Sequence, residues 1–282
     1  MKSKIKGYEN YLISEEKSDA TVKKYIHDVQ VFFDWLGERE LCKSVVQEYK
    51  RELMTEYAIK SVNSIISSLN SFFDWHGHSE CRVKNLKIQK EVFCEPNREL
   101  TMKEYECLLR TAKEQGKKRL CLVMQTICST GIRISELKYI TVEAVKSGAA
   151  MISCKGKNRK ILIPQMLCKI LKPYAKEQNI KKGSIFITKK GKPLDRSNVW
   201  AEMKKLCKKA GVLATKVFPH NLRHLFGKRY YALYQDISRL ADILGHTSIN
   251  TTRIYTTESG ETHRIRIQKL GLIFDLFSEN TT

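Results

Sequence analysis

The first 76 residues carry apolar side chains every three or four positions, which is the spacing of one buried face on an α-helix. Ser18 or Asp19 is suited to cap the second of these segments, and Gly37 is suited to end it. The pattern predicts helices over 4–14, from Ser18 or Asp19 to Gly37, over 43–57 and over 61–76. Together they would form a small helical bundle of about 85 residues.

A polar stretch that contains Pro96 separates this part of the chain from the rest. Helical spacing stops over 87–99, and residues 101–104 then form a capping box that starts a new helix. At roughly 100–200 residues per domain, a chain of 282 residues suggests two domains. We therefore predict an N-terminal helical domain over 1–86, a linker over 87–99 and a second domain over 100–282.

Both helical and strand-like spacing occur in the second part, so its structure is predicted to be mixed. Apolar runs at 149–154 and 160–163 flank the polar, glycine-containing segment 155–159, which favours a β-hairpin, and 184–188 is a third candidate strand. Helices are predicted over 101–114, 117–129, 133–139, from Pro164 onward, from Asp195 to Gly211, and over 219–234, 236–244 and 248–255. The fold class is therefore mainly α with a small β-sheet: an N-terminal helical bundle followed by a mixed α+β domain.

Charge is distributed unevenly between the two predicted domains. The chain has 51 Lys and Arg against 30 Asp and Glu, which gives a formal net charge of +21. Residues 1–98 hold 16 basic and 15 acidic side chains, whereas residues 99–282 hold 35 and 15 and carry +20. Such a field favours a polyanionic partner, of which nucleic acid is the commonest. A lysine-rich solvated surface is the alternative explanation, and charge alone leaves both open.

The sequence gives little support to membrane proteins or to metal–thiolate sites. It has no run of about 18 apolar residues, and its N-terminus turns acidic where a signal peptide would be apolar. A cytoplasmic protein with no membrane partner is therefore expected. The nine cysteines are scattered without a CxxC pair, which argues against a zinc knuckle or a thioredoxin-like site and favours buried, reduced thiols.

Three segments of the second domain combine residues that suit phosphate chemistry. They are TGIRISEL at 130–137, HNLRH at 220–224, and LGH at 244–246, which is followed nine residues later by Tyr255. Each also has an ordinary structural explanation. These explanations are a surface arginine, a half-buried histidine pair, a helix-ending glycine, and one tyrosine among twelve.

Taken in this order, the segments resemble the tyrosine recombinase family, especially its small Xer-like and integrase members. TGIRISEL is similar to the segment that carries the family's first arginine, and HNLRH is similar to its His-x-x-Arg motif. KG at 155–156 looks like the position of its lysine, and LGH with Tyr255 looks like its final histidine and its nucleophile. The resemblance covers residues 100–258 well. It extends more weakly to the N-terminal helices, which are similar in kind to the family's DNA-clasping domain.

The resemblance implies catalytic roles for Arg133, Lys155, His220, Arg223, His246 and Tyr255. Tyr255 would attack a DNA phosphodiester to form a 3′-phosphotyrosyl link and a free 5′ hydroxyl. Charge that builds on the non-bridging oxygens would be stabilised by the forked donors of Arg133 and Arg223, with His246 as a third donor. Because the phosphodiester energy is kept in the covalent bond and the arginines act as the electrophile, neither a metal nor a cofactor is expected.

Proton transfer is implied for two further groups of the same set. A phenol with a pKa near ~10 needs a base at neutral pH, and His220 fits that role. The leaving 5′ oxygen needs an acid, for which the resemblance implies Lys155. Lys157 lies two residues away and is an alternative.

The resemblance also implies partners. These are double-stranded DNA, other copies of the chain in a tetramer on two DNA sites, and accessory DNA-bending or directionality proteins, in the setting of a mobile genetic element. The apolar tail over about 259–282 would contact a neighbouring protomer. The alternative is that the tail folds back onto its own domain.

Three other functions fit parts of the pattern. A nicking–closing topoisomerase would relax any supercoiled DNA, and a DNA-binding regulator without catalysis would form no covalent adduct. A metal nuclease that uses His220, His224 and His246 would lose its activity to a chelator.

Overall fold

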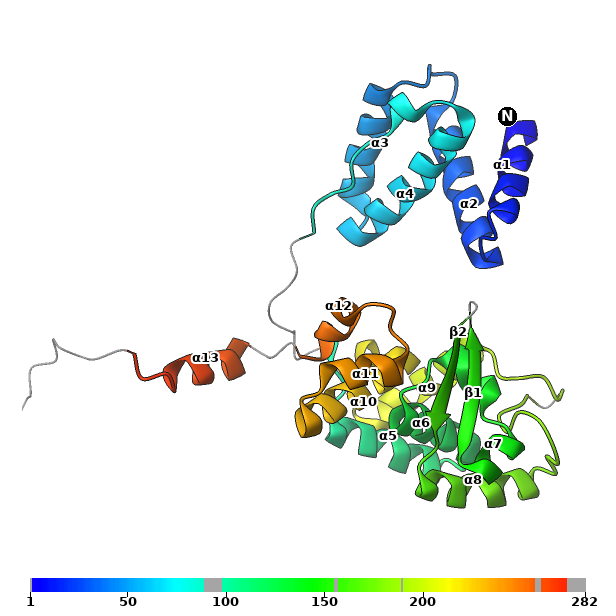
Figure 1. The fold of residues 1–282 in the computed structure, drawn as a ribbon, viewed down its shortest axis with the longest axis vertical. Coiled ribbons are helices and arrows are strands. Elements are labelled where there is room, and N and C mark those ends of the chain that lie inside the picture. Colours follow the sequence, from blue (N-terminus) through cyan, green and yellow to red (C-terminus); the bar gives the residue numbers. More distant parts are fainter. Residues whose placement is uncertain (1, 89–97, 155–156, 189, 257–259, 273–282) are drawn as a thin grey trace, which may run out of the picture. The chain divides into compact units, whose positions relative to one another are not determined.

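The apolar spacing near the N-terminus produces helices in the computed structural model, as predicted (Figure 1). The structure describes residues 2–88, 98–154, 157–188, 190–256 and 260–272. The internal contacts of the chain separate it into two units, Met1–Lys90 and Glu91–Thr282. Each unit contains a hydrophobic core of its own.

The first unit is a helical bundle built around aromatic side chains. Its elements are α1 (Lys2–Ser14), α2 (Asp19–Leu36), α3 (Lys43–Glu56), α4 (Ile59–His76) and the short 3-10 helix η1 (Ser79–Cys81). Ser18 caps α2 by accepting a hydrogen bond from the Thr21 amide, and Gly37 ends that helix with a φ of 61°. Buried rings that meet edge to face fill the core, among them Tyr8, Phe32, Phe72 and Phe73.

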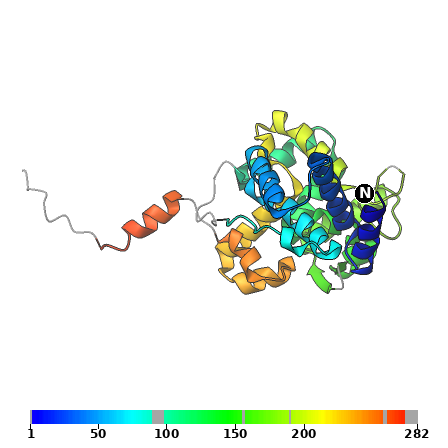
Figure 2. The same cartoon turned by 90° about the horizontal axis from the view of Figure 1, so that it is seen from above.

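The second unit combines helices with a two-stranded antiparallel sheet. Its elements are α5 (Met102–Glu114), α6 (Lys118–Thr130), η3 (Ile134–Tyr139), α7 (Val142–Ser147), β1 (Ala149–Cys154), β2 (Lys157–Leu162), α8 (Gln165–Glu177), α9 (Arg196–Ala210), η4 (Ala214–Lys216), α10 (Pro219–Tyr234), α11 (Ile237–Leu244), α12 (Ile249–Thr252), η5 (Arg253–Tyr255) and α13 (Gly260–Gln268). Helix α10 contacts both α6 and α11, and α11 contacts α12. In the view from above, the golden-to-orange segments α10, α11 and α12 lie together (Figure 2).

The hairpin is tighter than the apolar pattern predicts. Cys154 pairs with Lys157, so β2 begins three residues before the apolar run at 160–163. The polar residues Asn158 and Arg159 extend the strand because backbone groups, whatever the side chain, make the ladder. This extension places Arg159 on a strand rather than in a turn.

The segment 184–188 forms isolated bridges instead of the predicted strand. One bridge joins Ile187 to Pro193, and proline has no amide hydrogen with which to continue a ladder. Ile185 and Phe186 are nevertheless buried in the core of the unit. The apolar run at this position therefore reports burial, and the prediction of a strand is wrong.

Three helical segments also differ from the predictions. Helix α7 was not predicted, although Thr141 caps it by accepting a hydrogen bond from the Ala144 amide and Gly148 ends it in the left-handed region. The segment 133–139 is a 3-10 helix, and 248–255 divides into a single α-turn and a 3-10 turn. The form of these short elements depends on the contacts that their residues make, so the apolar spacing along the chain does not predict it.

The membrane and cysteine expectations can be compared with the described part of the chain. Within it, no helix is both long enough and apolar enough to cross a bilayer. Cys81, Cys168 and Cys207 are free thiols that are buried, as expected. Cys107 is exposed, so the expectation of burial does not hold for every thiol.

Candidate active site

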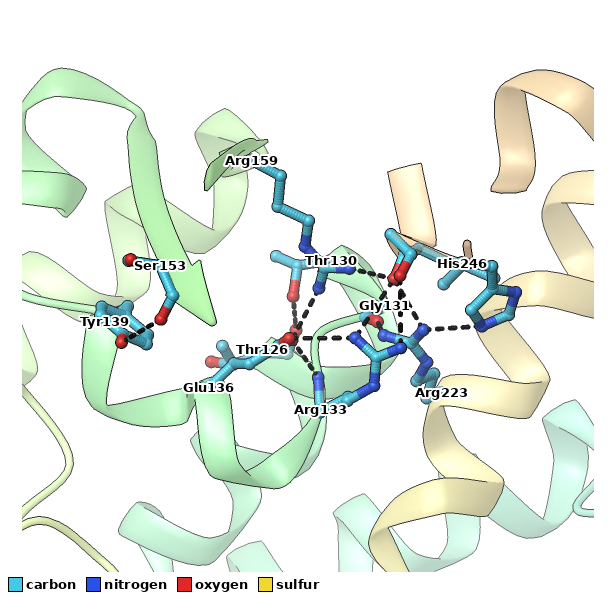
Figure 3. A network of polar contacts seen from close by, with 12 residues as sticks. Thr126, Thr130, Gly131, Arg133, Glu136, Tyr139, Ser153, Arg159, Arg223 and His246 are labelled. Carbon is cyan, nitrogen blue, oxygen red and sulfur yellow. Dashed lines mark hydrogen bonds and ion pairs between the residues drawn. The ribbon is translucent and has the colours of Figure 1, made fainter. Parts of the chain in front are cut away.

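Residues from three separate segments of the second unit meet at one place (Figure 3). Arg133 follows the end of α6, and Arg223 lies in the second turn of α10. His246 follows α11, and Tyr255 ends η5. The structure thus brings together four of the side chains that the sequence motifs single out.

Arg223 is the buried centre of this arrangement, with 1% of the residue exposed. Pro219 occupies the first position of α10, where its fixed φ and missing amide hydrogen favour a helix start. Arg223 Nη1 donates to the Gly131 carbonyl at 2.6 Å, and Nη2 donates to the Leu244 carbonyl at 2.8 Å and to His246 Nε2 at 3.0 Å. Burial lowers the pKa of Arg223 to about 10, so the side chain remains charged at neutral pH.

Gly131 is required where α6 turns toward the site. It ends the helix with a φ of 65°, in the left-handed region that favours glycine. A Cβ atom at this position would lie 2.5 Å from the Phe226 ring and 2.9 Å from the Leu244 side chain. The missing side chain therefore allows the close approach by which the Gly131 carbonyl reaches Arg223.

Arg133 is more accessible, with 43% of its side chain exposed. Its backbone N–H donates to Glu136 Oε2 at 2.7 Å, and its Nη1 donates to Glu136 Oε1 at 3.1 Å. Its contacts with the carbonyls of Leu244 and Gly245 are both at 3.5 Å, the limit for a hydrogen bond. These long contacts are weak, so the guanidinium can exchange them for an incoming anion.

His246 is held as a neutral imidazole. Burial, together with the charges of Arg223 and Arg133, lowers its pKa to about 4. Because an arginine N–H can only donate, His246 Nε2 accepts the bond from Arg223, and Nδ1 donates to Thr252 Oγ1 at 2.9 Å. The predicted role of His246 as a donor to a phosphate, if taken by Nε2, therefore requires a second proton or the other tautomer.

Tyr255 lies buried beside the guanidinium of Arg223. The His224 ring tilts against it with centroids 4.9 Å apart, and the His246 ring stacks on it at 6.2 Å. Within the described part of the chain, no group meets hydrogen-bond geometry with its hydroxyl, although Arg223 interacts with it. Burial raises the pKa of Tyr255, while the charges of Arg223 and Arg133 lower it, and the net direction is upward. The phenol is thus protonated at neutral pH and needs a base in order to attack.

His220 lies one turn before Arg223 on α10 and is exposed. Burial of part of the ring lowers its pKa, as do the charges of Arg223 and Arg133, which leaves a neutral imidazole able to accept a proton. Lys155, the other residue with a predicted proton-transfer role, lies outside the described residues.

Several residues of the site were not identified from the sequence. Glu136 stands in the TGIRISEL motif, and its spacing three residues after Arg133 is that of a capping glutamate, which could have assigned it a contact. Gly227 lies inside α10, where glycine is unusual and therefore informative. Arg159 gave no signal, because its contacts depend on how distant segments meet. Thr252 lies only six residues after His246 but belongs to none of the motifs.

Replacing Gly227 with alanine should impair the tyrosine without unfolding the helix. The added Cβ would lie 2.6 Å from the Tyr255 ring and force it to move. Alanine at an interior helix position usually gains about 0.5–1 kcal/mol over glycine, which partly offsets the strain. If Tyr255 is the nucleophile that the resemblance implies, the rate of covalent DNA adduct formation should fall, with helix content unchanged by circular dichroism. A variant with the full rate would show that the position of the ring is not critical.

Acidification should destabilise this unit over a defined pH window. Burial lowers the pKa of both His224 and His246 to about 4, below the value near ~6.5 of an unfolded histidine. The unfolded state therefore binds more protons between these values, so stability is complete above pH ~6.5 and is lost as the pH falls toward ~4. At pH 5 the loss is about 2 kcal/mol per histidine.

Thermal unfolding at pH 7.5 and pH 5.0 measures this loss. His224→Gln should flatten the pH dependence, whereas His27→Gln, which changes an exposed ring in the first unit, should not. Identical pH dependence in all three proteins would contradict the assignment.

Comparison with known proteins identifies the family. Residues 98–261 match the phage integrase family, and residues 5–79 match the phage integrase N-terminal SAM-like domain. The chain belongs to the phage integrase family. This phage integrase family chain is 27% identical to the tyrosine recombinase XerA of Pyrococcus furiosus, over 96% of this chain and 95% of that protein. It is 28% identical to a tyrosine recombinase of Agathobacter rectalis, over 91% and 92%.

Solved structures show the same fold for this member of the phage integrase family. A lambda integrase dimer bound to a COC′ core site aligns with a TM-score of 0.74 and 19% identity, over 99% of each chain. XerH bound to a palindromic difH substrate aligns with a TM-score of 0.70 and 19% identity, over 89% of this chain and 79% of that one. The predicted fold class and the family resemblance are confirmed, and the chain is a DNA breaking–rejoining enzyme of the tyrosine recombinase type.

Proposed function

We propose that this chain cleaves DNA at specific sites with Tyr255 as the nucleophile, and that Arg133, Arg223 and His246 bind the scissile phosphate. One observation supports this assignment most strongly. Arg223 is hydrogen-bonded to His246 and to the carbonyl that Arg133 also reaches, and its charge acts on the buried hydroxyl of Tyr255. A nucleophile thus lies close to donors that could bind the oxygens of a five-coordinate phosphorus in the transition state.

The proposed reaction exchanges one phosphodiester for another. Tyr255 Oη forms a bond to phosphorus, the bond from phosphorus to the 5′ oxygen breaks, and a 3′-phosphotyrosyl link remains. The phenol proton passes to His220, and Lys155 protonates the leaving 5′ oxygen. Attack by a 5′ hydroxyl of another strand reverses these steps and joins new partners. This chemistry would serve DNA integration, excision, inversion or resolution.

Exposure of the tyrosine is a necessary part of this scheme. The Tyr255 hydroxyl is buried in the free protein, so it must become accessible when DNA reaches the arginines. The phosphate would replace the weak 3.5 Å contacts of Arg133 and would add negative charge where Glu136 offsets the arginines only in part.

The proposed partners follow from charge and from the C-terminal segment. The +20 carried by residues 99–282 supports double-stranded DNA as the ligand, with the helical residues 1–86 gripping the same duplex across the linker 87–99. Ile265, Ile267, Leu270 and Leu272 are exposed, which supports a tail that docks on a neighbouring protomer of a tetramer. A cytoplasmic role in a mobile genetic element, with accessory DNA-bending or directionality proteins, completes the proposal.

Covalent capture tests the function directly. The protein is incubated with sheared DNA from its source organism, detergent is added, and protein-linked fragments are recovered and sequenced at their ends. We expect fragments attached through their 3′ ends at a recurring sequence. Adducts at unrelated sequences, with relaxation of any supercoiled plasmid, would indicate a topoisomerase. Tight DNA binding without an adduct would indicate a regulator, and loss of cleavage on adding a chelator would indicate a metal nuclease.

A further inference from the structure

Arg159 is a largely buried cation to which the proposed reaction assigns no role, yet it contacts two segments of the site (Figure 3). It lies on β2 with 16% of its side chain exposed. Its Nη2 donates to Glu136 Oε2 at 2.6 Å, and its Nη1 donates to the Leu244 carbonyl. Gly245 leaves the space that this contact needs, because a Cβ there would lie 2.1 Å from Arg159 Nη1.

Glu136 connects Arg159 to Arg133. Its carboxylate is 3% exposed, and it also accepts the backbone N–H and the Nη1 of Arg133. A buried carboxylate left without a cation is strongly destabilising, so this carboxylate needs a cationic partner at all times. Because Arg159 supplies a second cation, Arg133 is not the sole partner of this carboxylate and retains donors for a phosphate.

The Leu244 carbonyl connects Arg159 to the other side of the site. The same oxygen accepts from Arg223 Nη2 at 2.8 Å and lies 3.5 Å from Arg133 Nη1. It stands two residues before His246. One planar guanidinium on β2 therefore joins the segment that begins with Arg133 to the segment that leads to His246.

We propose that Arg159 is a positioning residue for strand cleavage. Its two terminal nitrogens fix the distance between these segments and hold the Arg133 guanidinium where it can bind the scissile phosphate, without Arg159 itself touching DNA. The inference rests on the proposed function of the site. Lysine cannot take this role, because a single ammonium cannot span both acceptors as a rigid fork does.

The first test compares Arg159→Lys with wild type on a synthetic duplex that carries the captured sequence. We expect the single-turnover rate of adduct formation at saturating protein to fall about 10–100-fold. A loss of this size is typical when a residue that orients a metal ligand through a hydrogen bond is replaced. The dissociation constant for the duplex should stay unchanged. The control is Lys160→Gln, which removes an exposed cation from the same strand and should keep the wild-type rate. A wild-type rate for Arg159→Lys would overturn the proposal.

A double-mutant cycle separates positioning from general damage. If Arg159 acts through Arg133, the double variant with Arg133→Ala should be no more than about twofold slower than Arg133→Ala alone. Multiplication of the two losses would mean that Arg159 acts independently, which contradicts the proposal.

A glycine pair tests the same contact while Arg159 is retained. Gly245→Ala would push the guanidinium off the Leu244 carbonyl and should reproduce the rate loss of Arg159→Lys. Gly211→Ala imposes similar left-handed strain, at a φ of 65°, with no atom within 4 Å of the added Cβ, and should leave the rate unchanged. Equal rates for the two glycine variants would count against the contact, even if Arg159→Lys failed to fold.

A measurement without DNA keeps this inference separate from the proposed function. In the free protein, Arg159→Lys should shift the NMR signals of the Arg133 amide and the His246 imidazole, because both depend on the bridge. Lys160→Gln should shift neither. Unchanged signals would overturn the positioning role. Absence of a covalent adduct from wild type, with the shifts present, would instead refute the proposed function alone.

Discussion

Tyr255→Phe is expected to abolish the covalent DNA adduct while leaving the fold as stable as wild type, or slightly more stable. Removal of a covalent nucleophile typically lowers a rate by about 10⁴ or more. The hydroxyl is buried beside the Arg223 guanidinium with no partner in hydrogen-bond geometry, so its loss removes a desolvated polar group and no well-formed bond. The gain in unfolding free energy should be between zero and about 1 kcal/mol.

The matched measurements for this variant are adduct yield after detergent, duplex affinity and melting temperature. Unchanged affinity and an unchanged or higher melting temperature, together with loss of the adduct, would assign the nucleophile. Continued adduct formation by Tyr255→Phe would refute Tyr255. A lower melting temperature would show that the hydroxyl makes a bond in solution.

Arg133→Ala and Arg223→Ala should both lose cleavage activity, but only the second should lose much stability. Loss of one preorganised donor to a transition-state oxyanion typically costs a factor of about 10²–10³ in rate. Arg133 is half exposed, and its carboxylate partner keeps Arg159, so its removal should cost only about 1 kcal/mol of stability. Arg223 is buried against two carbonyls and an imidazole, so its removal should cost about 2–4 kcal/mol.

The two arginine variants are compared by single-turnover cleavage, by duplex affinity and by unfolding in denaturant. Affinity should change little in both variants, because many phosphate contacts share the binding energy. Parallel losses of affinity and cleavage in Arg133→Ala would mean that this arginine positions DNA and does not stabilise the transition state. The stability difference also makes Arg133→Ala the better of the two variants for mechanistic work.

The sequence predicts most of the helices because long amphipathic segments, such as α2 and α4, show the helical period in their apolar residues. The prediction of secondary structure fails where the conformation of a short segment is set by its tertiary contacts. Residues 184–188 look like a strand but lie in the core with a proline opposite, and 133–139 takes the tighter 3-10 form. The start of β2 is missed because its first residues are polar.

The residues of the site also fall into those that the sequence predicts and those that it does not. Arg133, Arg223, His246 and Tyr255 can be chosen from the sequence because local motifs surround them, and the structure places them together. Arg159 has no local pattern, and its contacts with Glu136 and Leu244 span 23 and 85 residues of sequence. Contacts of that length follow from the tertiary fold, so no spacing rule along the chain predicts them.

The Leu244 carbonyl, which Arg223 and Arg159 share, has a consequence for how this protein tolerates sequence change. Every amino acid supplies a main-chain carbonyl, so no substitution at position 244 can delete this acceptor. Scanning that position would measure only the fit of its buried side chain. Replacement of the residue at position 244 therefore leaves the carbonyl that accepts from both arginines in place. Substitutions that bend the main chain, above all at the neighbouring left-handed Gly245, are the ones that would disturb it.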